Sequence, residues 1–70
     1  MTLYQIEYVY TDRSDATTCQ DILDSDEKNM TKQRADVLLA LSYPLEQRKG
    51  IRVTKVTQVD DSGRTIREVP

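Results

Sequence analysis

The chain has 70 residues, with ten basic and twelve acidic side chains and a formal net charge of −2. It has no histidine and a single cysteine, which excludes an internal disulfide and the usual zinc site of four Cys or His ligands. Its length allows one small domain, residues 1–70, and leaves self-association or partner binding as sources of extra stability.

Residues 3–11 alternate in polarity and are rich in β-branched and aromatic side chains, which predicts a strand. One face of that strand carries Tyr4, Ile6, Tyr8 and Tyr10. The other face has only Leu3 and Val9 as apolar residues, so the tyrosine face makes the better core. We therefore favour Tyr4, Ile6 and Tyr8 beneath a helix with Tyr10 half exposed, and the alternative is a bare sheet face that binds a partner.

Residues 11–16 are polar and predict a turn. Residues 17–23 either return as a second strand or form a short helix, because the adjacent Ile22 and Leu23 break the period of two. Residues 24–29 then form a charged linker rich in residues that begin helices.

Residues 30–43 carry the helical pattern. On a helical wheel Met30, Val37 and Leu41 lie together, and Ala35, Leu38 and Leu39 widen the apolar arc. Asn29 or Thr31 is the expected N-cap, and Pro44 ends the regular part by restricting the residue before it. The broad arc suits one helix laid across a sheet.

The C-terminal part predicts a basic loop at 45–50, a strand at 51–59, a turn at 60–63 and a strand at 64–69. Within 51–59, Val56 is out of step with the other apolar residues, which indicates a β-bulge or contacts on both faces. The element order is β(β)αββ. The predicted fold class is α+β, a small antiparallel sheet of three to four strands with one helix on one face.

The residue inventory does not favour an enzyme, and we assign no catalytic residue, metal site or cofactor. Cys19 is flanked by Thr18 and Gln20, with Asp21 beyond, so nothing near it in sequence stabilises a thiolate. The segment from Asp24 begins like a calcium loop but departs from that pattern at its fifth, sixth and twelfth positions.

Charge is unevenly placed along the chain. Residues 1–28 hold seven acidic and two basic side chains, whereas residues 29–70 hold five acidic and eight basic ones. We expect the acidic residues of 11–27, five aspartates and Glu27, to project from one end of the molecule and to attract a basic protein surface. The predicted partner-binding residues are Tyr10, Asp12, Asp15, Asp21, Asp24, Asp26 and Glu27.

A basic group gives an alternative function, an accessory protein that binds nucleic acid. Its possible phosphate contacts are Arg48, Lys49, Arg52 and Lys55. The acidic isoelectric point of about 4.9 argues against a dedicated nucleic-acid binder.

The sequence also bounds the location. No apolar run is long enough to span a membrane, and the N-terminal residues lack a signal pattern, so we expect a cytoplasmic protein with no membrane contact. A single free cysteine agrees with a reducing compartment.

The segment ADVLLALSYPLEQRKGIRVTKVTQV, residues 35–59, reads as a helix, a proline-containing loop and a strand. In this segment, and in size, acidity and element order, the chain is similar to small phage-encoded inhibitors. The resemblance implies a helix-on-sheet domain that blocks a host machine such as RNA polymerase, a nuclease or a CRISPR effector complex. We therefore expect a small, acidic, non-enzymatic protein-binding module whose partner is a larger protein or complex, with a homodimer as another possible assembly.

Overall fold

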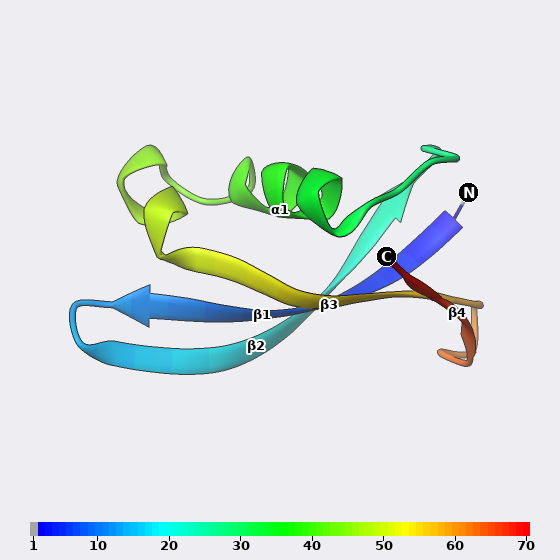
Figure 1. Cartoon of the computed structure of the whole chain (residues 1–70), viewed down its shortest axis with the longest axis horizontal. Coiled ribbons are helices and arrows are strands. Elements are labelled where there is room, and N and C mark those ends of the chain that lie inside the picture. The colour runs from blue at the N-terminus through cyan, green and yellow to red at the C-terminus, as the bar shows by residue number, and fades with distance from the viewer. Residues whose placement is uncertain (1) are drawn as a thin grey trace.

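The computed structural model describes residues 2–70, and Met1 lies outside the described residues. Its elements, in chain order, are β1 (Thr2–Asp12), β2 (Asp15–Ser25), α1 (Lys32–Ala40), the 3-10 helix η1 (Leu45–Gly50), β3 (Ile51–Val59) and β4 (Thr65–Val69). The strands of residues 2–70 form one antiparallel sheet in the order β2-β1-β3-β4, and α1 lies over one face (Figure 1). The predicted α+β fold is confirmed.

The first two strands form a long hairpin. Their pairing runs without interruption from Thr2 opposite Ser25 to Asp12 opposite Asp15, so residues 17–23 are a strand and the short-helix alternative is wrong. Arg13, in the two-residue turn, has a φ of 58°, the left-handed conformation that such turns use to match strand twist.

The helix begins where the cap was expected but is shorter than predicted. The Thr31 hydroxyl accepts a hydrogen bond from the backbone N–H of Arg34 at 3.0 Å, which confirms Thr31 as N-cap. The 3-10 helix η1 replaces the loop predicted at 45–50. At its end, the backbone of Gly50 lies so close to β1 that a Cβ there would collide with the Thr11 carbonyl oxygen.

The face that α1 turns to the sheet differs from the prediction. Ala35 and Leu39 are buried, whereas Val37 and Leu41 are 47% and 61% exposed. Ala35 and Leu39 are four residues apart and share one stripe of the helix, and a residue two positions further on points about 200° away. The wheel showed a broad apolar arc, and the helix uses only the part of it around Ala35.

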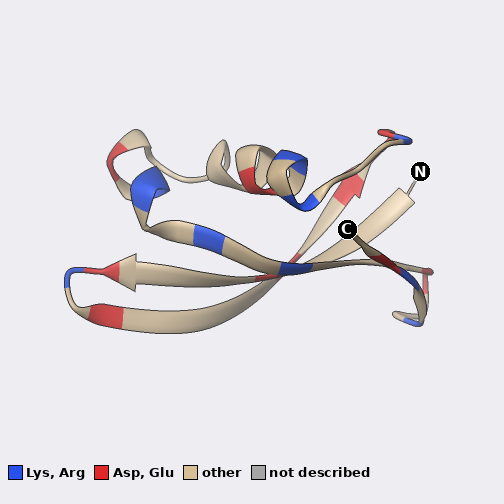
Figure 2. Cartoon of the chain, viewed as in Figure 1, with Lys and Arg blue, Asp and Glu red and all other residues tan. Residues whose placement is uncertain are grey.

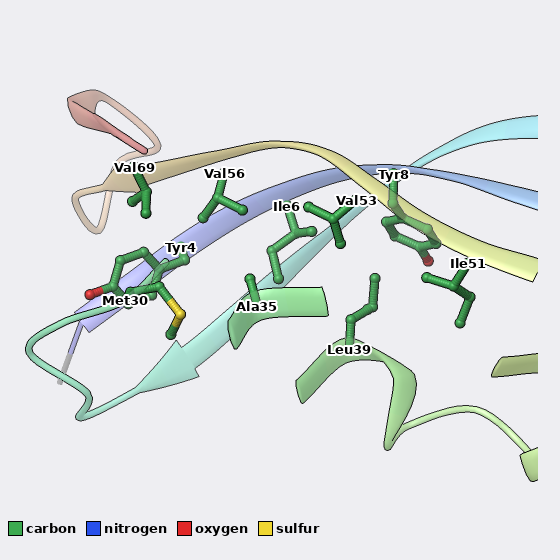
Figure 3. Packing of buried hydrophobic residues seen from close by; sticks show 10 residues of the cluster. All are labelled: Tyr4, Ile6, Tyr8, Met30, Ala35, Leu39, Ile51, Val53, Val56 and Val69. Atoms are coloured by element: carbon green, nitrogen blue, oxygen red, sulfur yellow. The ribbon is translucent and has the colours of Figure 1, made fainter. Parts of the chain in front are cut away.

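The tyrosine face of β1 belongs to the core, as the sequence pattern predicted. Tyr4, Ile6 and Tyr8 are at most 4% exposed. Ile6 and Tyr8 lie beneath α1, and Tyr4 lies beside Met30, just before the helix (Figure 3). The buried cluster is completed by Met30, Ala35, Leu39, Ile51, Val53, Val56 and Val69. The Tyr4 hydroxyl donates to the Glu27 carbonyl at 3.1 Å, so the polar end of this ring has a partner at the rim of the core.

The irregular spacing in the third strand comes from a bulge, as predicted. Glu7 pairs with Lys55 and Tyr8 pairs with Val53, which leaves Thr54 as the extra residue. The Thr54 hydroxyl donates to the Glu7 carbonyl at 3.0 Å. The bulge turns both Val53 and Val56 toward the helix, although they are an odd number of positions apart.

The turn predicted at residues 60–63 is confirmed. The Asp60 carboxylate accepts hydrogen bonds from the backbone N–H groups of Ser62 and Arg64 and from the Ser62 hydroxyl, all at 2.8–2.9 Å. These bonds, the Ser62 hydroxyl first, hold the pKa of Asp60 below its ordinary value. Gly63 has a φ of +89°, which a residue with a side chain rarely adopts.

Candidate protein-interaction surface

The strand β2 is the most exposed long element of the described chain. Eight of its eleven residues are exposed and none is buried. It pairs with β1 on one side and forms an edge of the sheet on the other. The helix α1 packs mainly against β3 and does not extend over β2 (Figure 1).

The strand is also acidic. Asp15, Asp21 and Asp24 are exposed on it, and it carries no basic residue. Pairing places Asp21 opposite Ile6 and Asp24 opposite Leu3, so these two carboxylates project from opposite faces of the sheet.

The expectation that the acidic residues share one end of the molecule is wrong. Asp12 and Asp15 pair beside the hairpin turn, whereas Asp26 and Glu27 follow the far end of β2. The ten steps of about 3.3 Å from Asp15 to Ser25 separate the two groups by roughly 30 Å. Figure 2 shows acidic segments at both ends of the hairpin. The carboxylates therefore form a line along the hairpin instead of a cluster.

Glu27 has a structural role within the chain. Its carboxylate accepts from the Arg34 side chain, with an ion-pair distance of 2.8 Å, and its carbonyl receives the Tyr4 hydroxyl. These contacts join the end of β2 to the first turn of α1. Asp26, its neighbour, is exposed.

An apolar groove of about 150 Å³ runs between β2 and α1. Its lining combines side chains of both elements with the central strand: Ile6, Asp21, Ile22, Leu23, Leu38, Leu39 and Ser42. Leu23 and Leu38 are only partly buried, because the helix does not reach across β2. The sequence marked these leucines as apolar but gave no sign that the gap between them stays open. The groove is wide enough for a single apolar side chain beside the carboxylate of Asp21.

Near the hairpin turn, Tyr10 is half buried, as predicted, and stacks on Tyr43 with ring centroids 5.7 Å apart. Tyr43 also meets Tyr8 edge-on, and the Tyr8 and Tyr43 hydroxyls are 2.7 Å apart. Burial, and then the hydrogen bond to Tyr43, raise the pKa of Tyr8 well above its ordinary value. The rings of this trio are held in place and leave part of Tyr10 accessible. Tyr43 was missed as a possible site residue, because its position before a proline identified it only as a helix end.

Two members of the basic group have partners within the chain. The Arg48 guanidinium donates to the carbonyls of Ala40 and Tyr43 at 2.9 and 3.1 Å, so it caps the end of α1. Lys55 lies 3.7 Å from the Glu68 carboxylate. Lys49 and Arg52 are exposed.

In the part of the chain that the structure describes, no three cysteine or acidic side chains come close enough together to hold a metal ion. Neither is any helix of residues 2–70 long and apolar enough to cross a membrane. The half-buried Cys19 thiol lies 3.7 Å from the Thr17 carbonyl. Comparisons of the chain with known protein families, curated proteins and solved structures found no match.

Proposed function

We propose that this chain is a small, non-enzymatic protein-binding module that occupies a basic surface of a larger protein or complex. The observation that carries the proposal is β2, an exposed strand with three aspartates and no basic residue, placed outside the cover of the helix. Its action would be that of the small phage-encoded inhibitors that the chain resembles in size, acidity and element order, namely to block a surface of a host machine.

Electrostatics supports a protein partner with exposed lysine and arginine. A line of carboxylates along roughly 30 Å attracts a basic surface from a distance and raises the rate of association. Its neighbouring groove and the accessible part of Tyr10 offer apolar contact area, which gives a complex its lifetime. A cytoplasmic location agrees with the free Cys19 thiol, since reducing compartments keep thiols free.

The test uses two variants that change the net charge equally. In the first, Asp15, Asp21 and Asp24 become asparagine. In the matched control, Asp36, Glu46 and Asp61, which lie on α1, on η1 and in the turn before β4, become the corresponding amides. A partner is captured with the wild-type chain, purified, and its association rate is measured at rising salt.

We expect the β2 variant to associate about tenfold more slowly at low salt and to lose much of its salt dependence, while the control stays close to wild type. Equal behaviour of the two variants would show that β2 carries no special role and would refute the proposal.

Nucleic-acid binding by Lys49 and Arg52 is the alternative, but its observed support is weaker, because Arg48 and Lys55 are engaged within the chain. A gel shift at low salt distinguishes the two functions. A shift at micromolar protein that disappears when Lys49 and Arg52 become glutamine would favour the alternative.

A further inference from the structure

We propose that the free edge of β2 binds its partner by strand addition, pairing with an extended segment that carries lysine or arginine. This inference rests on the proposed function and specifies how the partner is held. It begins from the backbone of β2, whose outer side has no strand beside it in residues 2–70.

The hairpin geometry shows which backbone groups of β2 point away from β1. Residues that flank a two-residue turn exchange both hydrogen bonds, and the pattern alternates along the strands from there. Asp12 and Asp15 are that first pair. The next residue, Ala16, therefore points its N–H and C=O away from β1, and so does every second residue after it. The outward-facing set is Ala16, Thr18, Gln20, Ile22 and Asp24. In agreement, the Ile22 N–H donates to the neighbouring Asp21 carboxylate at 2.8 Å.

This edge lacks most of the features by which proteins block strand pairing. Residues 15–25 contain no proline and no lysine, and their register with β1 has no bulge. The opposite edge differs, since β4 has five residues and its pairing with β3 is interrupted after Gln58. A strand of eleven residues with a continuous register is the better template for addition.

The aspartates of β2 indicate which kind of strand can bind at this edge. A second copy of the chain, paired edge to edge, would place six aspartates on two adjacent strands with no cation between them. The same three aspartates attract a basic strand. Because Asp21 lines the groove beside Leu23 and Leu38, an added strand with a cation opposite Asp21 can place in the groove an apolar side chain two residues away, which shares the same face. The occupant is therefore a partner segment that combines basic and apolar residues.

The test uses the full chain and two synthetic peptides. The first has lysine and valine two positions apart on the same face, in the repeat Lys-Thr-Val-Thr, over about ten residues, enough to span β2. The second has the same number of lysines but proline in place of its central valines, so it cannot form a ladder. Binding is followed at low salt by amide hydrogen exchange resolved to single residues.

We expect the first peptide to bind and to slow exchange at the five outward-facing amides by about tenfold or more, with little change at Thr17 and Cys19, which already bond to β1. Gln20→Pro removes one outward donor without breaking the pairing to β1 and should weaken binding about tenfold, whereas the matched Gln20→Ala should not.

The other outcomes overturn strand addition in different ways. Equal binding of both peptides, without protection of the outward amides, would mean contact by charge alone and would leave the proposed function intact. Binding of neither peptide would also refute strand addition, and the association rates with the captured partner then decide the proposed function separately. A dimer of the chain alone that Gln20→Pro abolishes would put a second copy on this edge and refute the basic occupant.

Discussion

Replacement of Tyr8 by phenylalanine tests whether the hydrogen bond between the Tyr8 and Tyr43 hydroxyls stabilises the fold. At neutral pH the Tyr8 and Tyr43 hydroxyls, 2.7 Å apart, share a hydrogen bond. Tyr43 is partly exposed, so its hydroxyl can turn to water when Tyr8 loses its own. The cost of Tyr8→Phe is then that of one net hydrogen bond, about 1 kcal/mol.

Alkaline pH gives the sharper measurement. Burial, and then the bond to Tyr43, raise the pKa of Tyr8 above the ordinary 10.0, so the folded state keeps this proton longer than the unfolded state does. The stability from Tyr8 is therefore complete below pH 10 and is lost as pH rises above it, by about 1.4 kcal/mol per pH unit. A chain this small has only about 3–5 kcal/mol in total, so the loss is large.

Tyr8→Phe cannot lose that proton. It should start about 1 kcal/mol below wild type at pH 8, fall less steeply above pH 10, and reach equal stability near pH 11. Urea denaturation at pH 8 to 11, followed by far-UV circular dichroism, gives both curves. Tyr43→Phe is the control, because it removes the bond but leaves Tyr8 buried, so its alkaline loss should remain. Parallel curves for Tyr8→Phe and wild type up to pH 11 would refute the reasoning.

Three further substitutions test the fold by urea denaturation. Leu39→Ala should cost about 2–5 kcal/mol because Leu39 is buried, while Leu41→Ala should stay within about 0.5 kcal/mol; equal costs would contradict the orientation of α1. Gly50→Ala should cost about 1–3 kcal/mol, since its Cβ meets the Thr11 carbonyl, and an unchanged midpoint would show that η1 can move away. Asp60→Ala should lower stability at pH 7, and its difference from wild type should shrink as pH falls below the ordinary 3.8, because the lowered pKa stabilises only the ionised carboxylate.

The elements with one buried face were readable from the sequence. Residues 51–59 form the strand predicted for them, and the misplaced Val56 correctly indicated a bulge. The strand β2 was ambiguous for a physical reason. Leu23 points to the face that α1 covers, and the exposed Ile22 points to the opposite face. Because apolar residues occur on both faces, the alternation of apolar and polar residues is lost.

The arrangement of the site was less predictable than its composition. The acidic excess of the first 28 residues is plain in the sequence, but strand length decides how far apart its members lie. The partners of Glu27 and Arg48 also depend on the packing of α1, because both bond to residues of the helix or its end. The sequence gives the number of charged residues but does not show which of them form ion pairs or hydrogen bonds within the folded chain.

The core and the proposed interaction surface lie on different strands, and this division has a consequence. The buried cluster draws its strand side chains from β1, β3 and β4, whereas β2 contributes only the partly buried Cys19 and Leu23. The ladder to β1 therefore holds β2 in place more than side-chain burial does, and its exposed residues are free to vary at little cost in stability. A small domain with one helix covers only part of its sheet. Here the uncovered part is an acidic edge whose side chains can change to suit a partner while the tyrosine-lined core stays the same.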